Sequence, residues 1–179
     1  FWLDLGDVRA VHAAWDDDAV ARFDAVAPGG RLGVDGHLRS GKETEIGGAI
    51  EVLTCGPEVE LPEPHAFTDK GGHRRTCTRI MWWRAGAATW RDIAVSVPDL
   101  SELPDEAVPG HIAAMQYPAD AAPVLFGHYW KSWDGGPGPL EAANAFCLDY
   151  SAALDGPLVC YRHEEGAPLD PSRLVVQHR

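Results

Sequence analysis

A chain of 179 residues, 45% hydrophobic and 23% charged, has the composition of a globular domain, which excludes a disordered or fibrous protein. Its formal net charge of −12 excludes broad nucleic-acid binding, which depends on clustered Lys and Arg. The sequence shows no signal peptide and no apolar run long enough to cross a bilayer, so we expect a cytoplasmic protein without membrane contact.

The first part of the chain predicts a strand, a helix, a loop and a second helix. Residues 8–13 are apolar and rich in β-branched side chains, which predicts a short buried strand. The acidic run 16–18 precedes an apolar-periodic stretch, so a helix is expected over 19–26. The glycine-rich segment 29–42 predicts a loop, and the apolar spacing over 43–54 predicts the second helix.

The middle of the chain predicts mostly short and irregular structure. Residues 61–64 are proline-rich and extended, and residues 68–73 have the composition of a turn. The stretch 76–83 is predicted as a strand or a short helix, and 98–109 as a loop. We therefore expect an accessory insert at about 29–120 within a single domain that spans the chain.

The last part of the chain predicts three short strands. The first covers 123–126 and runs into a Gly-His pair, and a loop follows over 131–139. The runs 145–148 and 158–161 are predicted as two strands of a hairpin or meander, with Asp155-Gly156 at the turn. Strands mixed with helices predict an α/β or α+β layered fold.

Three of these apolar segments end in a polar residue. His12, His128 and Asp149 each follow a predicted strand, and Gly127 beside His128 would let the backbone bend sharply. In layered α/β proteins, sites form beyond the carboxyl ends of strands, so neighbouring strands can bring these groups together. Neutral imidazole suits Zn, Mn, Fe or Ni, although a single His at a strand end is more often structural. Two imidazoles are too few for a catalytic metal, which needs three or more protein ligands.

Four segments, in chain order, resemble the C-terminal half of bacterial calcineurin-like metallophosphoesterases, in the branch of diadenosine tetraphosphatases and serine/threonine protein phosphatases. They are LGDVRAVHAAWD (5–16), GPEVELPEPHAFTDKGGHRRTCTRIMWW (56–83), PVLFGHYW (123–130) and CLDYS with LVCYRHEEG (147–166). The resemblance covers most of the chain. It implies the C-terminal part of a four-layer αββα sandwich.

In that family, two metal ions hydrolyse phosphomonoester or phosphoanhydride bonds with an activated water. The resemblance implies that His12 and His128 bind the same ion, which would be Mn, Fe, Zn or Ni. It gives Asp149 a structural role and assigns no catalytic residue to this chain. The implied substrate is a nucleotide polyphosphate, another phosphorylated small molecule or a phosphoprotein.

The family's early motifs are Asp-x-His, Gly-Asp-x-x-Asp-Arg and Gly-Asn-His, and none of them precedes His12. Gly6-Asp7 resembles the start of the second motif but lacks its second Asp. We therefore expect the other ligands from an N-terminal half of the catalytic domain, in the same polypeptide or in another chain. Because the sequence opens on Phe1 in mid-motif, we expect a fragment that is inactive alone. Half a sandwich leaves a sheet edge unpaired, which favours association, including a homo-oligomer.

The alternative is a non-catalytic fragment or interaction domain. Such a chain would keep this half of the fold without its chemistry. The two hypotheses differ in whether the early metal motifs are supplied, upstream or by a partner.

Substrate-binding candidates are Arg79, Arg84 and Tyr129. An Arg can hold a phosphate bidentately, yet most surface Arg residues are solvated or pair with acids. Tyr129 lies next to His128, where it either touches substrate or fills space. The charged turn 69–75 is either a phosphate-contacting lid or, as we favour, a solvated turn.

The tryptophans also have two interpretations. Trp82, Trp83 and Trp90 can form a base-stacking platform or part of the core, and the core is favoured. Trp15 and Trp130, close in sequence to the two candidate ligands, are expected to wall the site.

The remaining histidines and the cysteines are expected to be structural. The histidines in polar or proline-rich contexts are expected at the surface: His37, His65, His73, His111, His163 and His178. The cysteines form no CxxC pair and are expected as buried apolar residues in a reducing compartment: Cys55, Cys77, Cys147 and Cys160.

Overall fold

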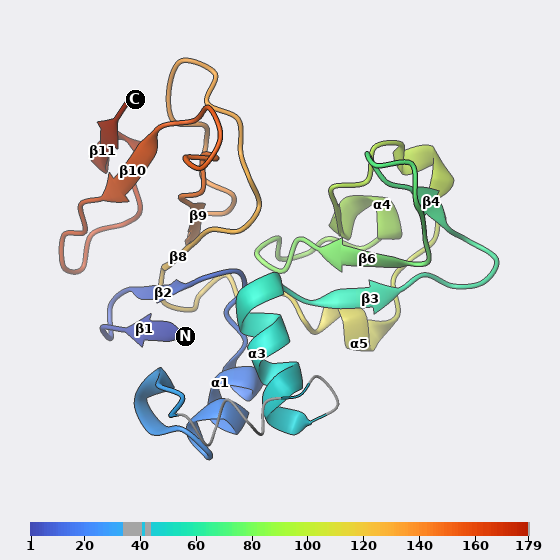
Figure 1. Cartoon of the computed structure of the whole chain (residues 1–179), viewed down its shortest axis with the longest axis horizontal. Coiled ribbons are helices and arrows are strands. Elements are labelled where there is room, and N and C mark those ends of the chain that lie inside the picture. Colours follow the sequence, from blue (N-terminus) through green and yellow to red (C-terminus); the bar gives the residue numbers. More distant parts are fainter. Residues whose placement is uncertain (34–40, 42–43, 179) are drawn as a thin grey trace. The chain divides into compact units, whose positions relative to one another are not determined.

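The computed structural model describes residues 1–33, 41 and 44–178, and Figure 1 labels most of their helices and strands. These residues form a mixed α/β structure with four α-helices and several small sheets, which confirms the predicted fold class. The chain divides into two compact units. The first unit is Phe1–Cys55 with Ala119–Arg179, and the second unit is Gly56–Pro118, which lies within the segment predicted as an insert.

The first unit contains a four-stranded sheet in the order β1-β2-β8-β9. Strand β1 (Trp2–Asp4) is antiparallel to β2 (Arg9–Val11). Strands β2, β8 (Val124–Phe126) and β9 (Ala145–Cys147) are mutually parallel. The carboxyl ends of these three strands therefore lie at the same edge of the sheet.

Two helices pack together in the first unit. Helix α1 (Asp17–Asp24) begins at the predicted acidic run, where the Asp16 carboxylate accepts a hydrogen bond of 2.6 Å from the backbone N–H of Ala19. Helix α3 (Glu45–Cys55) follows the predicted periodicity, and the N–H of Ala13 donates to its Leu53 carbonyl at 2.9 Å. The buried ring of Phe23 lies edge-on to Trp2, with 5.1 Å between ring centroids. Helix α1 therefore packs against the Trp2 face of the sheet.

The two faces of this sheet are covered unequally. On the Trp2 face, the strand register places Val11, Val124 and Phe126, all buried. The opposite face carries Leu3, which is 53% exposed, with the half-buried Ala10 and Leu125. Its β9 end is covered, because Phe146 is buried against Tyr161 with 6.0 Å between the rings. This leaves a partly open apolar face towards β1.

The predicted pairing of 145–148 with 158–161, as a hairpin or meander, is wrong. Strand β10 (Leu158–Tyr161) pairs with β11 (Leu174–Gln177) after a 3-10 turn at Pro171–Arg173, whereas β9 joins β8 in parallel. Short apolar runs do not reveal their partners, and the strand β11 was not predicted. A hairpin would require β9 and β10 to be antiparallel neighbours in one sheet.

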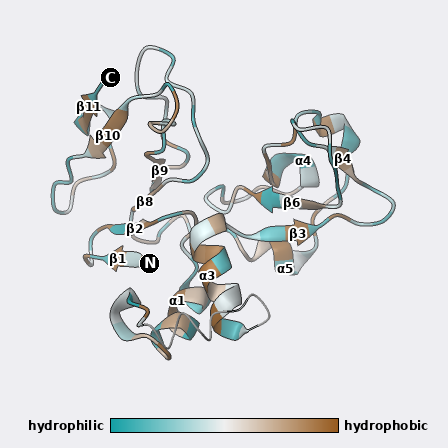
Figure 2. Cartoon of the chain, in the orientation of Figure 1, coloured by the Kyte–Doolittle hydropathy of each residue, from teal (hydrophilic) through white to brown (hydrophobic). Residues whose placement is uncertain are grey.

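The second unit is built from antiparallel pairs around its own core. Strands β3 (Glu58–Glu60), β6 (Cys77–Ile80) and β7 (Ala94–Val95) form one sheet, and β4 (Phe67–Thr68) pairs with β5 (Arg74–Arg75). Polar and apolar residues alternate along β3 (Figure 2), as expected for a strand with one buried face. The short helices are α4 (Trp90–Ile93) and α5 (Gly110–Ala113), with 3-10 turns at Pro28–Gly30 in the first unit and Leu100–Glu102 in the second.

Some predictions fall outside these observations. His37 and most of the predicted loop 29–42 lie outside the described residues. The four-layer sandwich stays a prediction. No helix in the described part of the chain has the length and apolarity to cross a membrane.

Candidate metal centre

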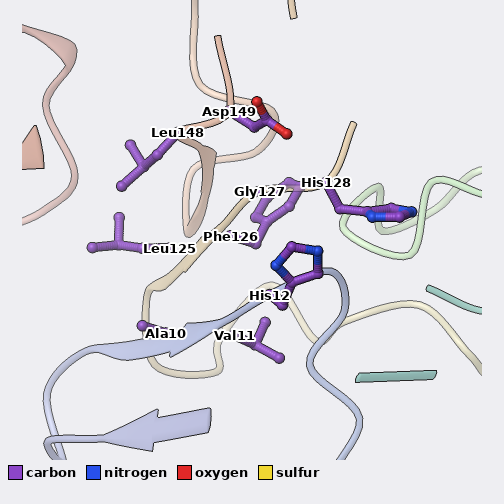
Figure 3. A pocket seen from close by; sticks show the side chains of 9 residues that line it. All are labelled: Ala10, Val11, His12, Leu125, Phe126, Gly127, His128, Leu148 and Asp149. Atoms are coloured by element: carbon purple, nitrogen blue, oxygen red, sulfur yellow. The ribbon is translucent and has the colours of Figure 1, made fainter. Parts of the chain in front are cut away.

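The carboxyl ends of β2, β8 and β9 converge on one pocket of about 390 Å³ (Figure 3). The residues that line it come from these three strand ends: Ala10, Val11, His12, Leu125, Phe126, Gly127, His128, Leu148 and Asp149. Its three polar side chains are therefore the strand-end residues singled out from the sequence. Their convergence follows from the parallel pairing.

The two imidazoles are neighbours. The ring centroids of His12 and His128 are 5.3 Å apart, with 65° between the ring planes. A ring nitrogen binds a metal at about 2.1 Å, so two imidazoles at a tetrahedral angle on one ion have centroids about 5 Å apart. The observed spacing fits two ligands of the same ion. The His12 side chain is exposed, whereas His128 is half-buried and its Nε2 atom is buried.

The backbone holds these residues in a strained arrangement. The Gly127 N–H donates to the His12 carbonyl at 2.9 Å, which extends the β2–β8 ladder up to the site. The sharp bend expected at Gly127 lies one residue later, because His128 itself has a left-handed φ of 72°. A non-glycine residue rarely adopts this conformation, which costs about 1–3 kcal/mol and is concentrated at functional sites.

Asp149 is held by the chain around it. Its carboxylate accepts a hydrogen bond of 3.0 Å from the Ser151 N–H, and its carbonyl accepts one of 2.8 Å from the Lys131 N–H. The Lys131 ammonium forms an ion pair of 2.5 Å with Glu141, which also accepts from the Cys147 N–H at 2.6 Å. Burial lowers the pKa of Lys131, but the hydrogen bond and charge of Glu141 outweigh burial and raise the pKa overall. The hydrogen bonds from Ser151 and Lys131 hold Asp149 at the wall of the pocket that His12 and His128 also line.

The aromatic residues near the site do not all behave as predicted. Tyr129 is half-buried and lies edge-on to His128, with 5.5 Å between ring centroids, and its role as a substrate contact stays a prediction. Trp15 is buried under the guanidinium of Arg9 at 4.5 Å. Neither Trp15 nor Trp130 is among the residues that line the pocket, and the Trp130 side chain is 71% exposed.

The other substrate-binding candidates belong to the second unit, whereas every residue that lines the pocket belongs to the first. Arg79 and Arg84 are exposed, and an Arg84 N–H donates to the Asp92 carbonyl at 3.1 Å. The three tryptophans considered as a base-stacking platform are 1–8% exposed and part of the core: Trp82, Trp83 and Trp90. This excludes them as an accessible stacking platform.

The charged turn 69–75 has its own internal structure. The Asp69 carboxylate accepts hydrogen bonds from the N–H groups of Gly71 and His73, both at 2.9 Å, and pairs with Arg75 at 2.8 Å. These contacts lower the pKa of Asp69 to about 2, chiefly through the His73 N–H and the Arg75 side chain. The arrangement is that of a solvated turn stabilised by one carboxylate.

Two further expectations are wrong in part. His163 is half-buried and pairs with Asp7 at 2.8 Å, so it is not a free surface residue. The Gly166 N–H and His163 both donate to Asp7, and they lower the pKa of its carboxyl. The cysteines are not uniformly buried, because Cys160 is exposed. Burial raises the pKa of the Cys147 thiol to about 12.

The two imidazoles are an incomplete ligand set. Among residues 1–33, 41 and 44–178, no group of three or more His, Cys, Asp or Glu side chains is arranged to hold a metal ion. The pattern Asp-x-His does occur at 35–37, but after the His12 strand rather than before it, and outside the described residues. A complete centre therefore needs further ligands.

Comparisons of the chain with models of known protein families, with curated proteins and with solved structures give no match. The interpretation of the site therefore depends on its geometry and on the sequence motifs.

Proposed function

We propose that the chain contributes His12 and His128 to one ion of a two-metal phosphoesterase that hydrolyses phosphomonoester or phosphoanhydride bonds. The observation that supports this is the placement of both imidazoles, 5.3 Å apart, at the shared edge of parallel strands. Two divalent ions, when bound, supply Lewis acidity and an activated water. Imidazole ligands suit Mn, Fe, Zn or Ni.

The role of this chain in the reaction is to orient ligands. His12 follows β2 directly, and the hydrogen bond from Gly127 fixes its backbone relative to His128. The left-handed backbone of His128 sets the direction of its imidazole. Asp149, anchored by Ser151 and Lys131, adds a carboxylate at the pocket wall. A rigid pair of imidazoles lowers the cost of ordering the site when metal binds.

We further propose that the missing ligands come from the N-terminal half of the catalytic domain, in the same polypeptide or in another chain. The partly open apolar face at Leu3, Ala10 and Leu125 offers a surface for that half to cover. The substrate of the complete enzyme would be a phosphorylated small molecule, such as a nucleotide polyphosphate, or a phosphoprotein. A cytoplasmic location and a homo-oligomer stay predictions of the sequence.

A second candidate is an interaction domain without catalysis. It is favoured by the incomplete ligand set, since two imidazoles alone do not make a catalytic centre. The two proposals differ in whether a complete protein that contains this chain binds two metal ions per site.

Metal titration tests the ligand role directly. Co²⁺ binding, followed by its visible absorption, should weaken by at least about tenfold in His12→Ala and in His128→Ala, because even lost outer-shell contacts cost 10–100-fold. His111→Ala, an exposed histidine of the second unit, is the matched control and should leave binding unchanged. Equal affinity in all three variants would refute the metal site.

Hydrolysis of an aryl phosphate tests the reaction. The complete enzyme should lose this activity in His128→Ala, while the present chain alone should show none. Normal turnover in that variant, or full activity with two tightly bound metals in this chain alone, would contradict the proposal.

A further inference from the structure

Trp130 differs from the other tryptophans of the chain. All seven lie among the described residues, and Trp130 is 71% exposed while the others are buried or half-buried: Trp2, Trp15, Trp82, Trp83, Trp90 and Trp133. Leaving an indole in water forgoes the free energy that burial would provide. A single exposed apolar residue is common on a protein surface, so exposure alone would mean little.

The backbone of Trp130 supplies a second, independent observation. Its φ is 45°, in the left-handed region that bulky residues rarely adopt, and it lies two residues beyond the similarly strained His128. Strained residues persist only where surrounding contacts over-determine them. Here the Gly127 N–H binds the His12 carbonyl on one side, and the Lys131 N–H binds the Asp149 carbonyl on the other. Trp130 therefore belongs to a segment whose two ends are hydrogen-bonded to residues that line the candidate centre.

The distance scale suits a nucleotide. Two residues span at most about 7 Å, so the indole is attached close to the imidazole of His128. In a nucleotide, the ribose places the base at a comparable distance from the phosphate. An uncharged stacking contact also suits a chain of net charge −12, because it adds affinity for an anionic substrate without relying on a basic surface.

We propose that Trp130 is the platform on which the nucleobase of a nucleotide substrate stacks when its phosphoryl group lies at His12 and His128. The inference rests on the proposed function and adds the residue that selects the substrate. Indole offers the largest flat apolar face among the side chains, and every base has a complementary face. Trp130 thus determines specificity, whereas the imidazoles hold the metal.

Adenosine tests the platform without phosphate or metal. In proton–nitrogen NMR spectra of the whole chain, the indole N–H signal of Trp130 is assigned by its loss in Trp130→Phe. Millimolar adenosine should shift this signal and leave that of Trp133 in place, since Trp133 is half-buried and lies edge-on to Tyr150 with 4.9 Å between ring centroids. No shift of the Trp130 signal would overturn the inference.

Binding of adenosine 5′-monophosphate and of inorganic phosphate to the Zn²⁺-loaded chain provides the second test. Trp130→Ala should weaken nucleotide binding by roughly tenfold to hundredfold and leave phosphate binding unchanged. Trp130→Phe, which keeps a ring, should restore most of the loss. Equal weakening of both probes would overturn the platform. A loss with phenyl phosphate as large as with the nucleotide would overturn the nucleobase in favour of a phosphotyrosine ring.

The two proposals fail separately. If the chain binds neither Zn²⁺ nor phosphate while adenosine still shifts the Trp130 signal, the metal site is wrong, and base stacking on Trp130 stands without the phosphoryl group at the imidazoles. If metal and phosphate bind at the imidazoles while adenosine has no effect, the platform is wrong and the metal site stands.

Discussion

The two units of the chain differ in where the partners of their polar side chains lie. In the second unit, the core of Ile80, Trp90 and Ile93 is closed, and Thr89 and Asp92 satisfy each other in a capping box. In the first unit, polar side chains follow three strand ends and line one pocket, where His12 is exposed and His128 and Asp149 are half-buried. Polar groups that are satisfied by near neighbours in sequence indicate structure. Polar groups from distant segments that converge on a strained, open edge indicate a site.

The largest expected effect concerns thiol reactivity beneath the site. Because the pKa of Cys147 is about 12, its thiolate fraction near neutral pH should be lower than that of an ordinary thiol by about a thousandfold. Alkylation followed by mass spectrometry should modify the exposed Cys160 quickly and Cys147 only when the sheet opens. Equal labelling rates would show that the sheet of the first unit is not closed as described.

The next largest effect is the loss of stability when a buried side chain of either unit is truncated to alanine. Phe23→Ala in the first unit should lower the free energy of unfolding by about 3–5 kcal/mol, and Ile93→Ala in the second by about 2–5 kcal/mol, since both side chains are buried. Urea denaturation followed by circular dichroism measures both. Leu100→Ala, at an exposed position, should change it by no more than about 0.5 kcal/mol. A loss at Leu100 as large as at Ile93 would contradict the assigned core.

Backbone strain gives a smaller effect that both units can show. His128→Gly should be more stable than His128→Ala by about 1 kcal/mol, because glycine tolerates a left-handed φ. Ser96, with a φ of 61° in the second unit, is the matched site and should show the same order. Thermal unfolding of the four variants measures the difference. An alanine variant at least as stable as its glycine counterpart would show that the strain is absent at that position.

The smallest effect is a pH dependence in the turn 69–75. The pKa of Asp69 is lowered from 3.8 to about 2, so its contribution to stability is complete above pH 3.8 and is lost as the pH falls towards 2. Asp69→Asn should remove this part of the acid sensitivity, as seen in the melting temperature between these pH values. Asp105→Asn, whose carboxylate is 75% exposed, is the control. An unchanged acid profile in Asp69→Asn would contradict the stabilising role of this carboxylate.

The sequence predicted the elements better than their pairing. The helix after the acidic run, the strand before His12 and the strand before Gly127 follow from periodicity and capping, and all three are present. The convergence of the strand ends follows from a general rule about parallel sheets. The β10–β11 pair was missed because the sequence of a four-residue apolar run does not indicate which strand it pairs with.

Some features of the site leave no local signal in the sequence. The contact between Asp7 and His163 joins positions 156 residues apart, and neither flanking segment indicates it. The left-handed φ of His128 and the exposed Trp130 occur in a segment whose ends, Gly127 and Lys131, donate hydrogen bonds to distant parts of the chain. Such properties arise only when the segments have assembled.

The parallel ladder between β2 and β8 has a consequence for the order of assembly. It pairs Arg9 with Val124, about 115 positions later, and contacts of such long range form slowly because the chain between them must first be closed. On the ribosome, His12 emerges long before its partner imidazole. A metal ion at the proposed site would therefore meet both imidazoles only after the sheet is complete, and the pair could not nucleate folding.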